Sequence, residues 1–310
     1  MNKYHHRLIP DNRPPLVTLL LIFACVLVGY FVSAFVSMVA AFPFLDSFGD
    51  FFTLLNEPKV GNWWAIMVMQ MTTAIVLFIV TPYVLIRFVF RSSNKYIVSL
   101  KRGPLLKLIG LTILATFSLM IVNTVLIEWN SNMVLPGFMS GIEEWMQTTE
   151  NKYAKLTEFL TTFTTVDKFI FTFFVIAIIP AVGEEYLFRG VIQTYFEKHI
   201  KNPHVAIILT GVLFSAIHFQ FYGFLPRAAL GILFGYLFYY SGNLIYPIIA
   251  HLINNGLTII LVYLFNTEVI TYDIEQAETP SLLIISLFLA AGLFFIFIFR
   301  KSIKNDVSHE

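Results

Sequence analysis

The sequence predicts an all-α fold, a polytopic membrane bundle of about eight transmembrane helices. Three observations predict it. The chain has 310 residues, of which 57% are apolar and only 13% charged, and its mean hydropathy is +0.76, whereas soluble domains carry about 25% charged residues. Eight segments are apolar and long enough, or nearly long enough, to cross a bilayer. The loops between them also alternate in charge, as the loops of a multi-pass protein do.

Each predicted span is an apolar run close to the roughly 20 residues that a transmembrane helix needs. The spans are expected at residues 16–42, 63–86, 104–127, 166–197, 203–220, 225–241, 244–265 and 281–299. The first apolar run exceeds the about 7–15 residues of a signal-peptide core, so we expect it to be retained as a span. The single cysteine, Cys25, excludes an intrachain disulfide.

Loop charges orient the predicted spans. Segment 87–107 holds six Lys or Arg residues and no acid, and both tails contain basic residues. Loops 128–165 and 266–280 are acidic. Basic segments stay in the cytoplasm, so both termini are expected there, as an even number of spans requires.

The apolar outer surface of the predicted bundle is expected to contact the lipid bilayer. The formal net charge of +1 gives no indication of nucleic-acid binding, and the oligomeric state is left open.

The chain divides into three parts by where its chemistry-bearing residues lie. Residues 1–165 hold the first three spans and a long outer loop, with no motif. Residues 166–265 hold the next four spans and every unusual polar residue. Residues 266–310 hold the last span and a basic tail. The middle part is therefore the predicted functional core.

Several polar side chains are expected near one depth in the membrane. A helical rise of about 1.5 Å per residue, counted from the cytoplasmic helix ends, puts Glu184 roughly 20 Å deep and His218 roughly 22 Å deep. His251 and Asn255 come at roughly 13 Å and 19 Å. A charge at the bilayer centre costs about 2.5–3.5 kcal/mol even on the mildest scale. Because polar residues at this depth are costly, the presence of several at similar depth favours a functional site. The structural alternative is that they form hydrogen bonds between helices.

Helical spacing predicts different tasks for the two adjacent glutamates. Glu185 and Arg189 are four residues apart with the acid first, which is the favourable order for an ion pair on a helix. Glu184 is turned by about 100° from Glu185 and is left unpaired on that helix. Two further pairs of polar or aromatic residues share a helix face at the same spacing. They are Phe214 with His218, and His251 with Asn255.

An unpaired carboxylate beside a histidine can activate water, and a second histidine with an amide can stabilise an oxyanion. Two histidines and a glutamate can also bind zinc, so Glu184, His218 and His251 are alternative metal ligands. A proton-coupled transporter would show repeat symmetry between halves, and residues 1–165 contain no second copy of the motifs. A non-catalytic membrane scaffold stays open.

The motifs Glu184-Glu185-x-x-x-Arg189, Phe214-x-x-x-His218 and His251-x-x-x-Asn255 resemble those of the CPBP intramembrane proteases. That family includes type II CAAX prenyl endopeptidases and bacterial bacteriocin-processing or self-immunity proteins. The resemblance covers roughly residues 166–265.

The resemblance implies a membrane-embedded catalytic cavity and an endopeptidase acting on a membrane-associated or lipid-modified peptide or protein. It implies that Glu184 and His218 activate water and that His251 and Asn255 form the oxyanion hole. Glu185, Arg189 and Phe214 are expected to support the site. No cofactor is expected, with Zn²⁺ as the alternative. An immunity protein without catalysis is the alternative function.

Overall fold

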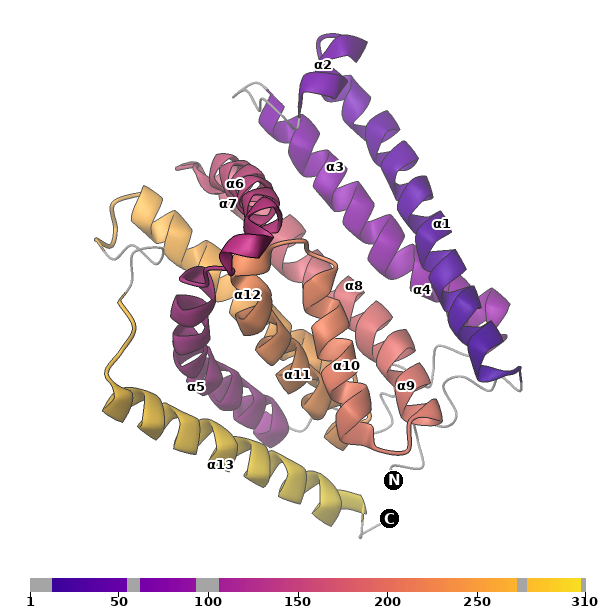
Figure 1. Cartoon of the computed structure of the whole chain (residues 1–310), viewed down its shortest axis with the longest axis vertical. Helices are drawn as coiled ribbons and strands as arrows, with labels where there is room; N and C mark the ends of the chain where they lie inside the picture. The colour runs from indigo at the N-terminus through magenta and orange to yellow at the C-terminus, as the bar shows by residue number, and fades with distance from the viewer. Residues whose placement is uncertain (1–12, 55–61, 93–105, 272–277, 308–310) are drawn as a thin grey trace.

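The computed structural model describes residues 13–54, 62–92, 106–271 and 278–307, and within these ranges it contains helices and no strand (Figure 1). Some of the charges used to orient the spans lie outside the described residues. They are the tail residues up to position 12, Lys95, Lys101, Arg102, Asp273 and Glu275.

The N-terminal part forms three long apolar helices. The second of them runs without a break through two π-helical stretches, η4 and η5. The elements are α1 (Pro15–Ala41), η2 (Phe42–Phe44), α2 (Phe48–Leu54), α3 (Trp63–Ile75), η4 (Val76–Val80), α4 (Thr81–Val84), η5 (Leu85–Val89) and α5 (Leu106–Ser131).

A polar helix, α6, precedes the core, in which the fourth long helix again contains two π-helical stretches, η8 and η9. The elements are η7 (Gly137–Met139), α6 (Ser140–Thr161), α7 (Val166–Thr172), η8 (Phe173–Ile178), α8 (Ile179–Leu187), η9 (Phe188–Gln193), α9 (Thr194–His199), α10 (Pro203–Ala216), η10 (Phe221–Gly223), α11 (Phe224–Ser241), α12 (Ile245–Asn266) and α13 (Leu282–Val307).

Seven helices of the described chain are long and apolar enough to cross a membrane, so the class of polytopic helical membrane protein is confirmed. The predicted count of eight spans is not confirmed. The fifth predicted span, 203–220, contains only α10, whose 14 residues rise about 21 Å against a hydrocarbon core of about 30 Å. The helix ends at Ala216, and Phe219 then takes a left-handed conformation with φ 53°. A residue in that conformation cannot continue a right-handed helix.

One side of the bundle holds both the first residues of α1 and the last part of α13. The Tyr195 hydroxyl of α9 donates to the Pro15 carbonyl at 2.8 Å. The Arg300 guanidinium of α13 lies 5.3 Å from the centre of the Tyr240 ring near the end of α11. We call this the terminal side.

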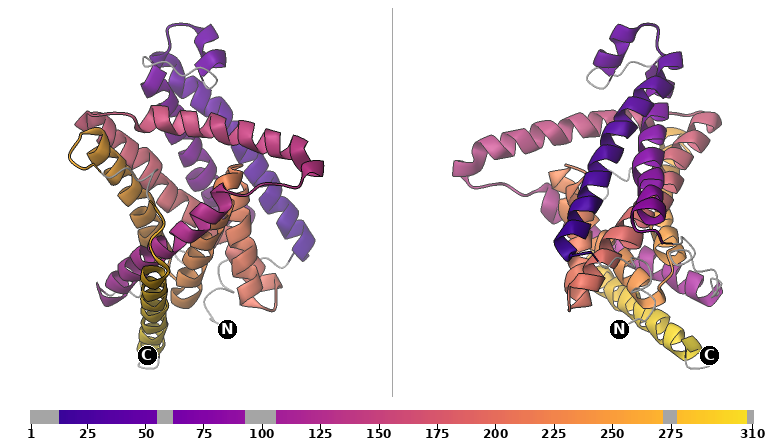
Figure 2. Two further views of the ribbon diagram at one scale, coloured as in Figure 1. Left: turned by 60° about the vertical axis from the view of Figure 1, so that its left-hand side comes forward. Right: turned by 90° about the vertical axis from the view of Figure 1, so that its right-hand side faces the viewer.

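The opposite side is organised around α6. The Asn130 amide at the end of α5 donates to the Phe221 carbonyl at 3.0 Å. Asn266, at the end of α12, donates to the Thr161 carbonyl at 2.7 Å. Figure 2 shows α6 running across the long helices at this end. We call it the α6 side.

The core helices α8 to α12 lie between two flanking pairs, α1 with α3 and α5 with α13 (Figure 1). Helices α10 and α11 approach closely because glycines face each other: a Cβ on Gly231 would lie 3.1 Å from the Gly211 Cα. On the other face of the core, a Cβ on Gly183 would lie 2.8 Å from the Phe78 Cβ of η4. Because glycine has no side chain, helices that meet at glycines can pack backbone to backbone in membranes.

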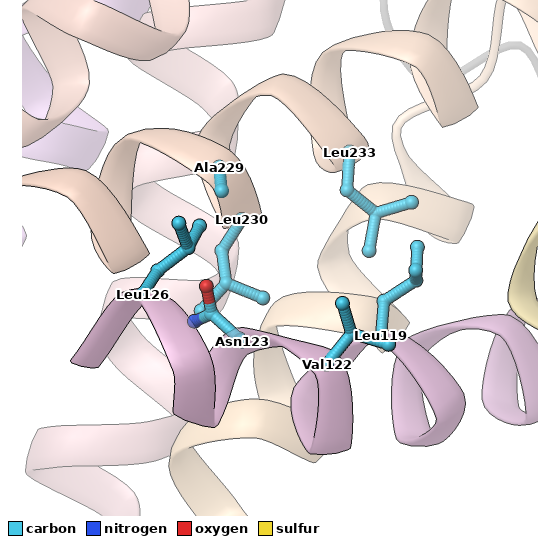
Figure 3. A pocket seen from close by; sticks show the side chains of 7 residues that line it. All are labelled: Leu119, Val122, Asn123, Leu126, Ala229, Leu230 and Leu233. Atoms are coloured by element: carbon cyan, nitrogen blue, oxygen red, sulfur yellow. The ribbon is translucent and has the colours of Figure 1, made fainter. Parts of the chain in front are cut away.

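A cavity of about 130 Å³ separates α5 from α11 (Figure 3). Its lining is apolar except for one amide, that of Asn123, and it contains none of the predicted site residues. It is lined by Leu119, Val122, Asn123, Leu126, Ala229, Leu230 and Leu233.

Candidate active site

The two glutamates lie on α8, in the middle of the continuous helix Val166–His199. At 34 residues this helix is longer than the roughly 20 residues that a transmembrane helix needs. It stays continuous and widens into the π-helical stretches η8 and η9 on either side of α8. The Thr194 hydroxyl donates to the Arg189 carbonyl at 2.9 Å. Such side-chain donors occupy backbone groups that widened turns leave weakly bonded inside a membrane.

The ion pair between Glu185 and Arg189 is confirmed. Arg189 Nη1 donates to Glu185 Oε1 at 2.9 Å, and both side chains are fully buried. Arg189 Nη2 donates to the Gly231 carbonyl at 2.6 Å. Its guanidinium also lies 5.0 Å from the Phe214 ring centre and 5.5 Å from that of Phe234. Arg189 thus joins α10 and α11 to the π stretch η9, which is a structural role.

Glu185 has a second partner that helical spacing did not reveal. His251 Nδ1 lies 2.9 Å from Glu185 Oε1. A carboxylate only accepts hydrogen bonds, so this contact assigns the proton to Nδ1 and leaves Nε2 as an acceptor in the neutral ring. The other nitrogen, Nε2, lies 3.1 Å from Asn255 Nδ2 and 3.9 Å from Glu184 Oε2. His251 therefore lies between the two glutamates.

Asn255 occupies both hydrogens of its amide nitrogen. One goes to His251 Nε2 and the other to the Ile176 carbonyl of η8, at 3.1 Å in each case. Its Oδ1 accepts from Asn254 Nδ2 at 3.0 Å. The predicted proximity of His251 and Asn255 is present. An oxyanion would have to displace one of the existing bonds of the Asn255 amide.

His218 follows the last turn of α10 and is partly exposed. Its Nδ1 lies 2.8 Å from the Phe214 carbonyl, so this nitrogen carries the proton and Nε2 is the free basic atom. The Phe214 ring packs edge-on against both histidines, with ring centres 5.3 Å from His218 and 5.8 Å from His251. Phe214 fixes the spacing of the two imidazoles, in keeping with its predicted supporting place.

Glu184 differs from its neighbour. Its carboxylate has no hydrogen bond from any described residue, and His251 Nε2, an acceptor in the neutral ring, lies 3.9 Å from its Oε2. The residue is 8% exposed, while Glu185 is fully buried. His218 and Glu184 make no direct contact; each presents a free acceptor.

The sequence analysis missed Arg227 of α11. This residue lies within electrostatic reach of Glu184 and His218. The signal was available, because Arg227 is a charged residue inside the apolar segment 225–241. A charge at that position is unusual enough to mark a site.

Zinc ligation does not fit the donors of the described residues. They include no group of three His, Cys, Asp or Glu side chains disposed to hold a metal ion. Both nitrogens of His251 are engaged, one with Glu185 and one with Asn255. Of the three alternative ligands, this leaves free only the Glu184 carboxylate and one nitrogen of His218, whereas a catalytic zinc usually has three protein ligands.

The fold and the site together define a class: an integral multi-pass membrane protein with a cluster of glutamate and histidine side chains contributed by α8, by the turn after α10 and by α12. Residues 166–257 match the model of the family described as type II CAAX prenyl endopeptidase Rce1-like. The resemblance to the CPBP proteases is confirmed across this stretch, which contains every predicted site residue.

Two bacterial relatives match parts of the chain. The membrane-embedded CAAX protease MroQ of Staphylococcus aureus (strain USA300) is 36% identical over 115 residues, which is 35% of this chain and 45% of that protein. The uncharacterized protein YpbD of Bacillus subtilis (strain 168) is 32% identical over 82 residues, 25% of this chain and 39% of that protein. The chain thus spans less than half the length of either relative. No solved structure matches it.

Proposed function

We propose that this protein is an intramembrane endopeptidase that hydrolyses a peptide bond in a membrane-associated or lipid-modified peptide or protein. The observation that carries the proposal is the state of Glu184. It is a buried carboxylate without a hydrogen bond, beside a glutamate whose own bonds are structural. Burying a carboxylate without a hydrogen-bond partner costs free energy. Such groups occur most often at functional sites, where the altered environment serves catalysis.

In the proposed reaction, Glu184 and His218 Nε2 hold a water molecule between them. Glu184 takes a proton as the water oxygen bonds to the peptide carbonyl carbon. The C–N bond then breaks, and Glu184 passes that proton to the leaving amine nitrogen. This is general-base followed by general-acid catalysis by one group.

We assign stabilisation of the oxyanion to the Asn255 amide, with His251 beside it as a positioning residue, because His251 Nε2 is an acceptor in the neutral ring and has no hydrogen to donate. The Asn255 hydrogen that now points to His251 Nε2 is the one available to an oxyanion, because the other is tied to Ile176. Glu185 holds His251 through Nδ1 and thereby fixes the ring. This hydrogen must exchange its bond to His251 Nε2 for one to the oxyanion.

The test is a cleavage assay with the purified protein in detergent, against quenched fluorescent peptides with and without a lipid-modified cysteine. Glu184→Gln keeps shape and removes the basic oxygen, so turnover should fall by about 10²–10⁴. The control is Glu144→Gln, an exposed glutamate of α6, which should retain full activity. If the wild type cleaves nothing, or Glu184→Gln is as active as the control, the non-catalytic scaffold or immunity protein becomes the better account.

We further propose that the reaction needs no metal. This is supported by the engaged nitrogens of His251. A zinc chelator should therefore leave the initial rate unchanged. Loss of the rate in chelator, recovered with added zinc alone, would contradict the proposal and restore Glu184, His218 and His251 as ligands.

A further inference from the structure

We propose that Arg227 binds a carboxylate group of the substrate, a specificity that rests on the proposed endopeptidase function. Arg227 is a half-buried guanidinium in the first turn of α11. Its Nη2 donates to Gln220 Oε1 at 2.8 Å, and its Nη1 lies 3.4 Å from the Gln220 carbonyl. Both acceptors are neutral, and no carboxylate of the described residues lies within ion-pair distance of it.

The contrast with Arg189 carries the argument. Arg189 is fully buried and has a carboxylate at 2.9 Å and two aromatic rings over its guanidinium. Arg227 has none of these, although an arginine away from water gains much from a bidentate carboxylate. A guanidinium has five N–H donors, and Gln220 occupies only two of them. The others remain for a ligand.

The position of Arg227 suits a substrate group next to the scissile bond. Arg227 lies within electrostatic reach of Glu184 and His218, and also of Glu150 on α6. Glu150 itself accepts from the Tyr222 backbone amide at 3.3 Å. Arg227 thus lies on the same short segment that contacts α6 and close enough to the proposed catalytic groups to interact with their charge.

The backbone that carries Arg227 is fixed. The Asn123 amide donates to the Pro226 carbonyl at 3.2 Å, and Figure 3 shows Asn123 on α5 facing α11. The Leu225 amide donates to Asn130 Oδ1 at 2.7 Å. The guanidinium passes over Gly223, where a Cβ would lie 3.0 Å from Nη2. A pre-organised cation loses little freedom when it binds an anion.

The probe is a fluorescent S-farnesyl peptide ending in Cys-Val-Ile-Met, because the matched family is described as prenyl endopeptidases acting on CAAX ends. Three forms of this peptide distinguish a C-terminal carboxylate from a side-chain carboxylate. The first has a free C-terminus, the second is the C-terminal amide, and the third is the amide with Asp as the last residue. Binding is measured by fluorescence anisotropy in Glu184→Gln, so that the result does not depend on cleavage.

With Arg227 intact, a carboxylate form should bind about 10- to 100-fold more tightly than the plain amide. Arg227→Gln should remove this preference while leaving amide binding unchanged, which also shows that the variant is folded. Arg227→Lys should retain part of it. The control variant Arg300→Gln, on the terminal side, should show the full preference for the carboxylate form over the amide. Preference for the free acid identifies a C-terminal carboxylate, and preference for the Asp form identifies a side chain.

Two results would overturn the inference. One is equal weakening of all three peptides in Arg227→Gln, which would mean that Arg227 serves only the fold or the charge of Glu184. The other is no discrimination among the three forms by the protein with Arg227 intact, including the case in which none binds. Neither result bears on turnover, so cleavage in the separate assay would still support the proposed function.

Discussion

Two carboxylates that are neighbours in sequence have different environments in this protein. Successive side chains on a helix are turned by about 100°, so adjacent residues face different neighbours. Glu185 points to Arg189 and His251 and accepts from both through Oε1. Glu184 points away from these donors and keeps a free carboxylate. The proposed separation of a base from an anchor follows from this single turn.

The anchor is tested by replacing Glu185. Glu185→Gln leaves Arg189 fully buried without its counter-charge, and loss of one partner of such a pair costs about 3–5 kcal/mol. We expect a lower melting temperature in detergent together with lower activity. Glu184→Gln should melt close to the wild type.

A double variant provides the control for this prediction. Glu185→Gln with Arg189→Met removes both charges, and it should recover part of the lost stability. It should not recover activity, because His251 has still lost the carboxylate that holds its Nδ1. If Glu184→Gln proved the unstable variant and Glu185→Gln the stable, inactive one, the roles would be reversed.

Among the helices, the contact of α10 with α11 decides how the site is assembled. The two backbones approach at Gly211 and Gly231, and the Gly231 carbonyl accepts from Arg189 at this contact. Helix α10 contributes Phe214, and His218 follows its last turn. The short helix is thus positioned by backbone contact with α11 as well as by its apolar surface.

Gly231→Ala tests this contact. The added Cβ would lie 3.1 Å from the Gly211 Cα and equally close to Phe214 Cδ1. Backbone cannot yield as a flexible side chain does, so we expect destabilisation of about 1–3 kcal/mol, together with reduced turnover. Thermal denaturation and initial rates measure both effects.

The matched control is Gly110→Ala on α5, where a Cβ would meet nothing within 4 Å. Alanine favours a helix over glycine by roughly 0.5–1 kcal/mol, so this variant should be as stable as the wild type or slightly more so. Equal stability of the two alanine variants would show that the helix contact is not tight.

For the molecule as a whole, the structure separates a terminal side from an α6 side, and the loop charges say which faces the cytoplasm. Arg300 and Lys301 belong to the terminal side, and Glu143, Glu144 and Glu150 lie on α6. Positive charge near helix ends is retained in the cytoplasm. The α6 side, with Arg227 below it, is therefore predicted to face outward.

Cysteine labelling tests this orientation. In a Cys25→Ala background, Glu144→Cys and Lys301→Cys each present one exposed thiol. A membrane-impermeant maleimide added to intact cells should label the first and spare the second until the cells are lysed. The reverse pattern would invert the orientation without changing the fold.

Local information in the sequence was enough for the helices and for one ion pair. The apolar runs predicted the spans, because a span requires a certain apolar length. The four-residue spacing predicted the pair of Glu185 with Arg189, because it depends on the pitch of a single helix. The motifs also placed every predicted site residue inside the stretch that matches the protease family. The catalytic roles of these residues stay predictions.

Other features needed contacts between segments far apart in the chain. The bond of His251 to Glu185 joins residues 66 apart, and it exists only because α12 packs against α8. Arg227 stands out in the sequence as a charge inside an apolar span, but its interaction with Glu184 depends on how α11 packs against α8.

The sequence by itself determined that this protein is a helical membrane protein and predicted which residues carry its chemistry, because apolar length and helical period are local properties of the chain. Only the tertiary structure decided which nitrogen of each histidine carries the proton, that Glu185 also binds His251, and that a second arginine, Arg227, lies near the site. Those outcomes depend on distances of about 3 Å between helices, and a difference of one turn in packing would change each of them.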